Sequence, residues 1–215
     1  IELEWNLTPL CERISIIRQT LAYIAANNLT HNTGELTESL ATIRALLITI
    51  EDTLETPTEL PGPTGESNIL HLDSRGVFIH PVCENSHLTF YLTSILSAIT
   101  CGNSIIVTTN TAKNKSVQFI VDALARSGLP QGLVQTCAIE LLPALLHQNH
   151  IHGAIIIPNS NLLNYVKKTI SARKGAILPV LSTENYILLF QKMITEKTIT
   201  TDTTAAGGNT SLMTM

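Results

Sequence analysis

Short strand-like runs alternate with helix-like segments through most of the chain, and this order constrains the fold more than any other feature. Runs rich in β-branched residues recur between segments whose apolar residues follow helical spacing. Strands are predicted at Ile69–Leu72, Val77–His80, Ser104–Thr108, Leu133–Cys137, Ala154–Ile157 and Ile177–Leu181. Helices are predicted between them at His87–Thr100, Ala112–Arg126, Leu141–His147 and Leu162–Arg173. This alternation indicates βαβ units, so we predict an α/β fold with a Rossmann-like, open parallel sheet covered on both faces.

Two helices precede this region, and we predict that they form an antiparallel hairpin over residues 1–56. The first helix is predicted over residues 8–29, with Thr8 as its N-cap and Pro9 at its first position. The second helix is predicted over residues 35–54 and carries leucine and isoleucine along one face. Turn-forming residues separate the two helices, which favours a hairpin.

The remainder of the chain divides into a sheet domain and a terminal segment. Prolines and glycines mark a loop at Pro57–Gly65, and the sheet domain is predicted over residues 57–184. Residues 185–215 are predicted to hold a helix end at Ile187–Phe190 and then an extended run at Ile194–Thr200. An extended run of this kind can add to the edge of a neighbouring sheet. The small-residue tail after it suits a segment that is either disordered or ordered by a surface that it fits closely.

Composition excludes several classes of protein. Hydrophobic residues make up 44% of the chain, enough for a core, whereas charged residues make up only 14%, which suits a piece that packs against another surface. The net charge is −4 and no basic stripe is present, so nucleic-acid binding is not expected. No apolar run approaches the ~20 residues that a membrane span needs. We expect a cytoplasmic protein with four free thiols, and we interpret the start at Ile1 as a boundary inside a longer gene product.

The histidines of one segment form an HxxHxH pattern that is typical of some metal sites. His147, His150 and His152 span a predicted helix end, a loop and a strand start, so their rings are expected to point in different directions. Histidine is also favoured at a helix C-terminus by the helix dipole. We therefore predict no metal ligands among them.

The sequence places no general base beside the candidate nucleophiles. Cys83 and Glu84 are neighbours in an extended run, where adjacent side chains point apart. Cys101 and Cys137 suit packing in the core, and Glu184 suits a capping or solvent-facing carboxylate. GxGxxG and Walker patterns do not occur. We predict no catalytic or cofactor-binding residue in this chain.

Three segments resemble the nucleotide-binding domain of the aldehyde dehydrogenase superfamily. Arg75–Pro81 looks like its RGV strand ending in proline, Ala98–Val107 looks like its A-x-x-x-GN segment, and Ser127–Val134 is close to its AGLPxGVV turn. The resemblance covers Arg75 to Glu184 and implies the superfamily's fold.

The same resemblance shows departures at the functional positions. Val82–Ser86 stands where the family has a tryptophan-asparagine-phenylalanine run whose Asn helps to hold the substrate oxyanion. Thr108–Asn110 stands where the family places a lysine that contacts the cofactor ribose, and Pro158–Asn161 replaces its Gly-Ser-Thr loop beside the phosphates. The domain that carries the family's catalytic cysteine has no counterpart after Glu184. Without an activated thiol there is no acyl-enzyme chemistry, so no cofactor is expected in this chain.

Two further segments resemble a family of bifunctional bacterial enzymes within this superfamily. Leu60–Asn68 and Thr203–Thr214 look like the C-terminal region of enzymes that join an FAD-dependent proline dehydrogenase to an NAD-dependent pyrroline-5-carboxylate dehydrogenase. The resemblance implies a non-catalytic C-terminal domain whose partner is the catalytic dehydrogenase domain of the same polypeptide, with a homo-oligomer also possible. It implies that the C-terminal motif covers the dehydrogenase site and helps to seal the substrate channel. The covering residues would be Thr204, Ala205, Ala206, Gly207, Gly208, Asn209, Ser211 and Leu212. The alternative is a module that retains a weak NAD site.

Overall fold

A five-stranded parallel sheet forms the centre of the molecule. The computed structural model describes residues 2–27 and 33–202. The strand order is β5-β4-β3-β6-β7. The strands are β3 (Val77–Val82), β4 (Ser104–Thr109), β5 (Val134–Ala138), β6 (Gly153–Ile155) and β7 (Val180–Leu181). The predicted Rossmann-like open sheet is confirmed.

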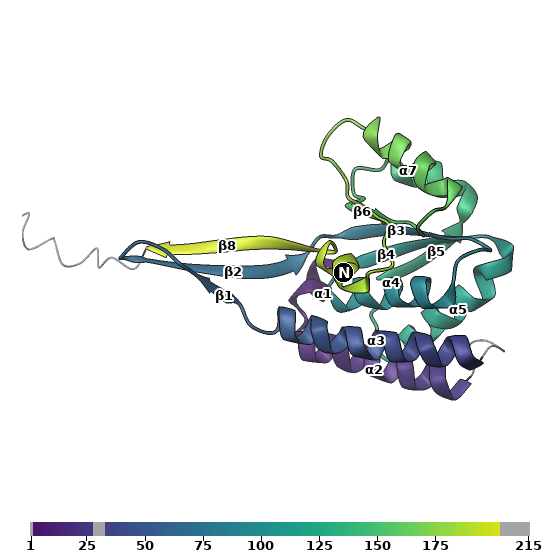
Figure 1. Ribbon diagram of the computed structural model, residues 1–215, viewed down its shortest axis with the longest axis horizontal. Coiled ribbons are helices and arrows are strands. Elements are labelled where there is room, and N and C mark those ends of the chain that lie inside the picture. The colour runs from purple at the N-terminus through teal and green to yellow at the C-terminus, as the bar shows by residue number, and fades with distance from the viewer. Residues whose placement is uncertain (1, 28–32, 203–215) are drawn as a thin grey trace, which may run out of the picture.

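Helices cover both faces of this sheet (Figure 1). One face carries α4 (Leu88–Thr100) and α5 (Thr111–Arg126). The other face carries the short α6 (Leu142–Leu146) and α7 (Asn161–Ser171). Side chains alternate across the pleated strands, so Phe78 packs with α4 whereas Ile79 packs with α6 and α7. No helix in the described part of the chain is long and apolar enough to cross a bilayer.

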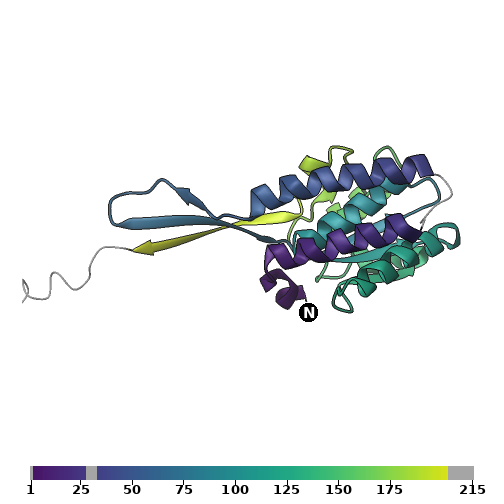
Figure 2. The ribbon, with the colours of Figure 1, turned by 90° about the horizontal axis from the view of Figure 1, so that it is seen from below.

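The N-terminal helices form an outer layer beneath α4 and α5. They are α1 (Glu2–Leu7), α2 (Leu10–Asn27) and α3 (Thr33–Leu54), and α2 and α3 lie side by side (Figure 2). Their apolar faces join the same hydrophobic core as α4, so α4 is buried on nearly every side. The predicted start of the first helix was wrong. α1 precedes α2, and Thr8 donates its hydroxyl to the carbonyl of Glu4 at 3.3 Å instead of capping α2.

An antiparallel three-stranded arm projects from the body (Figure 1). Its order is β1-β2-β8, with β1 (Thr58–Leu60), β2 (Glu66–Ser74) and β8 (Ile194–Asp202). The interpretation of residues 57–65 as a loop alone missed β1. The extended run near the C-terminus does add to a sheet edge, but the edge is β2 of the same chain. A short helix, α8 (Tyr186–Gln191), leads into β8.

A glycine turn at the end of α4 returns the chain to the sheet. Gly102 has φ +86°, and its amide donates to the carbonyl of Ile99 at 3.0 Å. The amide of Asn103 donates to the carbonyl of Ala98 at 3.0 Å. This pattern ends a helix by satisfying its last carbonyls, and it needs a residue that tolerates positive φ.

One buried carboxamide then joins the arm to the parallel sheet. The side-chain oxygen of Asn103 accepts from the backbone amides of Arg75 and Gly76, at 2.8 and 2.9 Å. Its side-chain nitrogen donates to the carbonyl of Met193 at 3.0 Å. The side chain of Arg75 reinforces the joint, because it donates to the carbonyls of Lys192 and Ile194 at 3.0 and 2.8 Å. The β2–β3 turn and the start of β8 are therefore fixed to the end of one helix.

Replacement of Asn103 is expected to destabilise the protein strongly. Asn103→Ala removes three hydrogen bonds and takes from the buried amide of Gly76 its side-chain partner, so the free energy of unfolding should fall by about 2–4 kcal/mol. Urea denaturation followed by circular dichroism measures this loss. Asn114→Ala, at an exposed position of α5, is the control and should change stability by no more than about 0.5 kcal/mol. Equal stability of the two variants would contradict the role given to Asn103.

Candidate functional site

The point where the strand order reverses is the natural place for a ligand in a sheet of this type. Ligands of open α/β sheets bind outside the carboxyl ends of the strands, where neighbouring crossovers run to opposite faces. Here β4 lies on one side of β3 and β6 lies on the other, so that point is at the carboxyl ends of β3 and β6. A cavity of about 400 Å³ opens there, between the segment after β3 and the segment that leads into α7. Its lining residues are Cys83, Asn85, Ser86, His87, Ile157, Pro158, Asn159, Ser160, Asn161 and Leu162.

Two hydroxyl groups of this switch-point cavity form hydrogen bonds with backbone groups of their own segments. The hydroxyl of Ser160 donates to the carbonyl of Ile157 at 3.0 Å, and it does not cap α7. The hydroxyl of Ser86 accepts from the amide of Cys83 at 2.9 Å. Asn159 occupies the left-handed region with φ 58°.

These residues do not fit the pyrophosphate of a dinucleotide. Such a group binds at a glycine-rich turn whose backbone comes close and donates its amides. Pro158 has no amide to donate, and Asn159 carries a side chain where the turn would need to be bare. The lining also contains no lysine or arginine. The departure that the sequence indicated at Pro158–Asn161 thus lies in the switch-point cavity itself.

A second cavity, of about 450 Å³, lies at the carboxyl ends of β4 and β5. Asn110, at the position where the resemblance expects a lysine, is the N-cap of α5 and accepts from the amide of Lys113. The ammonium group of Lys113 lies 5.7 Å from the centre of the Tyr91 ring. Glu140 lines the cavity and no cation does. The side chain of Asn110 is therefore used to cap α5.

Full or partial burial raises the pKa of three cysteines. Burial raises the pKa of Cys101 to about 12, and the nearby guanidinium of Arg13 opposes that shift only in part. Burial also raises the pKa of Cys83 and of Cys137. Thiolate, the nucleophilic form, is disfavoured at all three. Cys11 is exposed on α2, outside the residues that line the cavities at the carboxyl ends of the strands.

The carboxylates singled out in sequence have separate surroundings. Glu84 is exposed beside Cys83. Glu184 lines a cavity of about 460 Å³ with Glu35, Glu38 and the aromatic Tyr186 among others. Glu35 already accepts a hydrogen bond from the amide of Leu88 at 3.0 Å, so it serves the N-terminus of α4. No candidate base therefore stands beside a candidate nucleophile with a lowered pKa.

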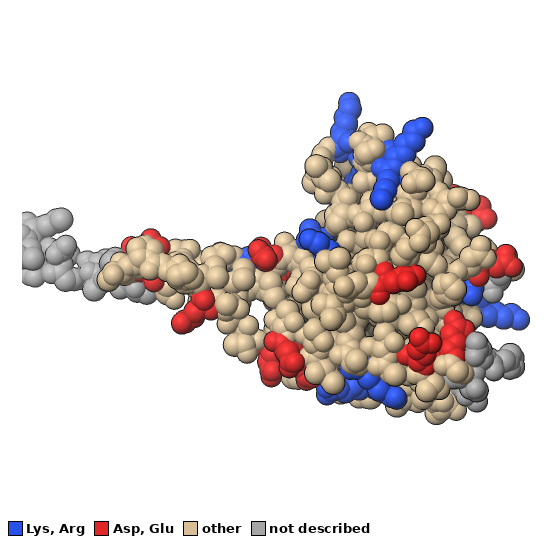
Figure 3. All heavy atoms as spheres, viewed as in Figure 1, with Lys and Arg blue, Asp and Glu red and all other residues tan. Residues whose placement is uncertain are grey.

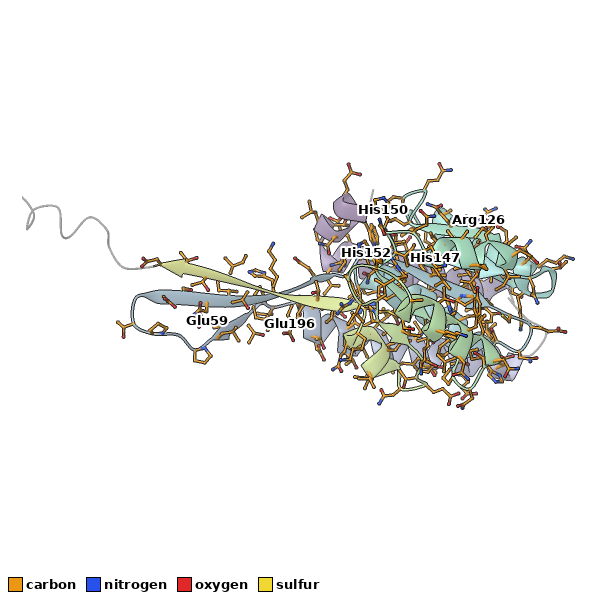
Figure 4. The ribbon with its side chains drawn as sticks, turned by 90° about the horizontal axis from the view of Figure 1, so that it is seen from above. Glu59, Arg126, His147, His150, His152 and Glu196 are labelled. Carbon is orange, nitrogen blue, oxygen red and sulfur yellow. The ribbon has the colours of Figure 1, made fainter. Side chains whose placement is uncertain are left out.

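The three histidines of the HxxHxH pattern lie around the α6–β6 connection (Figure 4). His147 is the C-cap of α6, and His150 is exposed in the loop that follows. The Nδ1 of His152 accepts a hydrogen bond from the amide of Val77 at 3.0 Å, so that ring positions the start of β3. Within residues 2–27 and 33–202, no group of three potential ligands is arranged to hold a metal ion.

A fourth histidine, His80, is buried on the central strand β3. The Nδ1 of His80 lies 2.8 Å from the carbonyl of Ile155 and must carry the proton, because a carbonyl only accepts. The ring packs edge-on against Phe90, and its Nε2 has no hydrogen-bond partner among the described residues. Burial lowers the pKa of His80 to about 4. The neutral ring is thus part of the folded state.

Protonation of His80 is expected to weaken the fold in mild acid. The folded-state pKa lies below the ordinary value of 6.5, so this stability is complete above pH 6.5 and is lost as the pH falls toward 4. The loss should approach about 3 kcal/mol. Chemical denaturation between pH 7.5 and 4.5 measures it, and His80→Gln should lack this part of the pH dependence. The same pH dependence in wild type and variant would exclude His80 as its source.

The predicted lid residues, Thr204 to Leu212, lie outside the described residues. The structure does show where the chain enters that segment. β8 runs outward along the arm, so that Ile194 pairs with Ser74 at the base and Asp202 pairs with Glu66 at the far end. The arm itself was not foreseen, since its strands lie far apart in sequence and only one of them alternates clearly.

The whole chain is similar to proteins of one family. A family model described as "Aldehyde dehydrogenase family" matches residues 3–207. No curated protein matches the sequence. A variant of proline utilization A from Bradyrhizobium japonicum has a TM-score of 0.75 at 23% identity, covering 84% of this chain and 20% of that chain.

Two further solved structures extend the comparison. Proline utilization A from Bdellovibrio bacteriovorus, inactivated by N-propargylglycine, has a TM-score of 0.74 at 12% identity, covering 84% of this chain and 21% of that chain. An NAD-dependent benzaldehyde dehydrogenase from Corynebacterium glutamicum has a TM-score of 0.68 at 15% identity, covering 85% and 43%. This chain therefore spans about one fifth of the length of the proline utilization A structures. At these identities the likeness shows a shared fold.

Proposed function

The chain belongs to the aldehyde dehydrogenase family, and on that premise we propose that it is a non-catalytic C-terminal domain of a bifunctional enzyme that oxidises proline to glutamate. The parent would be a proline utilization A, with an FAD-dependent proline dehydrogenase and an NAD-dependent dehydrogenase for pyrroline-5-carboxylate. The fold shared with two proline utilization A structures supports this assignment. So do the segments Leu60–Asn68 and Thr203–Thr214, whose sequences resemble that group. A parent of this kind would be cytoplasmic.

The residues that line the switch-point cavity are the main support for a non-catalytic role. Pro158 and Asn159 take the place of a phosphate-binding turn, and Asn110 is committed to capping α5. The cysteines nearest these cavities have raised pKa values, which is the opposite of what a nucleophile requires. The family fold is present, whereas the residues at the phosphate-binding turn do not suit a dinucleotide.

The arm supports a role in covering another domain. β8 has one hydrogen-bonded neighbour strand, β2, among the described residues, so the outer edge of Ile194–Thr201 can pair with a strand of a partner. β8 ends at Asp202, at the distal end of the arm, and the C-terminal motif, residues 204–212, follows it in the sequence. We propose that this motif lies over the dehydrogenase site and seals the channel for the intermediate. The partner would be the catalytic domain of the same polypeptide or of a second copy.

One observation favours an alternative function. The cavity at the ends of β4 and β5 is roomy and lined by hydroxyls and amides, including Thr109, Thr136 and Gln118. A weak NAD site could use such groups for the adenosine portion without binding the pyrophosphate well.

Calorimetry on the isolated chain separates the two functions. We expect no saturable heat with NAD up to millimolar concentration and no oxidation of glutamate semialdehyde, because the phosphate turn and the activated thiol are both missing. An active aldehyde dehydrogenase under the same conditions is the control. Saturable NAD binding would support the alternative, and aldehyde turnover would refute the non-catalytic role.

Truncation of the parent polypeptide tests the lid. Removal of residues 203–215 is expected to leave proline dehydrogenase activity unchanged and to release pyrroline-5-carboxylate into solution before glutamate forms. A chemical trap for the free intermediate measures that release. The matched control removes only residues 213–215 and keeps the motif, so it should behave as the intact enzyme. If both truncations channel equally well, the motif does not seal the channel.

A further inference from the structure

A cavity lies where the arm joins the body. Its volume is about 570 Å³, within the range of roughly 300–1,000 Å³ that is usual for small-molecule sites. Its walls come from the end of α3, the base of β2, the β2–β3 turn, and the run from the end of α8 into β8. It shares no lining residue with the two cavities at the carboxyl ends of the strands. A ligand in this arm-base cavity would therefore contact the arm and the body at the same time.

Two cationic side chains line the arm-base cavity and keep donors that the fold does not use. The guanidinium of Arg75 is held in place by its hydrogen bonds to the carbonyls of Lys192 and Ile194. Its Nη1 has no hydrogen-bond partner among the described residues, and it is not among the polar atoms that are shielded from solvent. The ammonium group of Lys192 is exposed and forms no ion pair in the described part of the chain. A carboxylate in the cavity can thus pair with two cations without breaking a bond of the fold.

The opposite charge comes from the arm. Glu196 lines the same cavity from β8, and Figure 4 shows it on the arm near the body. In the β2–β8 pairing it stands opposite Leu72, which packs against the core, so Glu196 lies on the body-facing side of the arm. Thr53 lines the cavity from the last turn of α3, which holds no basic residue, so the negative end of that helix dipole adds to the carboxylate. This side of the cavity favours an ammonium group.

The opposite charges of the arm-base cavity are not paired with each other. Within residues 2–27 and 33–202, neither Lys192 nor Glu196 forms an ion pair, although both line the same cavity. Figure 3 shows basic and acidic side chains together on the surface where the arm meets the body. A ligand with one charge would satisfy only one side of the cavity. A ligand that carries both a carboxylate and an ammonium group satisfies both sides.

We propose that the arm-base cavity binds a free α-amino acid with an uncharged polar side chain. The α-carboxylate lies toward Arg75 and Lys192, and the α-ammonium group lies toward Glu196 and the end of α3. The side chain of the ligand lies against the polar residues Thr53 and Gln191. A phosphate is disfavoured because Glu196 would face a doubly charged anion, and a simple amine is disfavoured because the two cations outnumber the one carboxylate.

Occupancy of the arm-base cavity would tie the arm to the body. The ligand would join β8 to α3 and to the β2–β3 turn, which are contributed by distant parts of the sequence. Binding would therefore limit movement of the arm relative to the sheet. None of the lining residues belongs to the C-terminal motif or to the carboxyl edge, so binding here does not depend on the proposed function.

Titration of the chain with L-glutamine tests the proposal, because this amino acid has both charges and an uncharged polar side chain. The matched ligands are its α-amide, which lacks the carboxylate, and N-acetyl-L-glutamine, which lacks the ammonium group. We expect saturable binding of L-glutamine by calorimetry and binding of each capped ligand that is weaker by about tenfold or more. In NMR spectra the backbone amides of Gln191, Thr195 and Glu196 should shift, while those of Thr109 and Asn159 at the carboxyl edge should not. Absence of saturable binding, equal affinity for the three ligands, or shifts confined to the carboxyl edge would each overturn the proposal.

Variants at exposed positions identify the groups responsible. Lys192→Gln should weaken binding of L-glutamine severalfold and change that of the α-amide little, because the amide has no carboxylate to lose. Lys197→Gln is its control, since Lys197 lies 3.9 Å from Asp73 and does not line the cavity. Glu196→Gln should weaken binding of L-glutamine severalfold and spare that of N-acetyl-L-glutamine. Its control is Glu59→Gln, which is also on the arm in Figure 4.

The controls decide between a specific site and a general effect of charge. Lys197→Gln and Glu59→Gln should leave the affinity for L-glutamine close to that of the wild type. All four positions are exposed, so circular dichroism should show folded proteins. If each variant and its control had equal effects, only the overall charge would matter and the proposed site would be wrong.

Discussion

The side chain of Asn103 makes three hydrogen bonds on which the arrangement of the whole molecule depends. They join the end of α4 to the β2–β3 turn and to the residue before β8. These parts are far apart in sequence, and the amide of Arg75 also donates directly to the carbonyl of Met193 at 3.3 Å, so the side chain of Asn103 reinforces a contact between backbone groups. The end of α4 is itself held by the N-terminal helices, because Trp5 donates to the carbonyl of Ile99 and Arg13 to that of Thr100. The sheet, the outer helices and the arm therefore meet at one helix terminus.

This joint lies at the opposite edge of the sheet from the switch-point cavity. The contacts around Asn103 lie at the amino edge of β3 and β4, whereas the switch-point cavity lies at the carboxyl ends of β3 and β6. Replacing a phosphate turn by Pro158 and Asn159 leaves the joint untouched. The arm is anchored to the same joint, so it keeps its place whatever happens at the carboxyl edge. The stabilising joint and the switch-point cavity are therefore separated along the strands.

Local patterns predicted the body of the fold, and non-local contacts account for what was missed. The helices and parallel strands were found because their apolar spacing is a property of consecutive residues. The pairing of β2 with β8 was not found, because 119 residues separate Ser74 from Ile194 in the sequence. Asn103 appeared in sequence as part of a family motif without a role. The substitutions at Asn110 and Pro158 were recognised, and the structure added that Asn110 is used as a helix cap.

The contacts around α6 could not be predicted for a related reason, since they join segments that are not consecutive. Nothing in Leu142–Leu146 indicates that Val77 and Ile106 will be left partly open. The positive charge of residues 141–183 is visible in the sequence, but the hydrogen bond from Arg173 to the carbonyl of Gln148 is not. Cations at helix C-termini are common because the helix dipole favours them, and that effect alone would leave Arg173 facing water. The hydrogen bond depends instead on how the end of α7 packs against the segment between α6 and β6, which no local sequence pattern records.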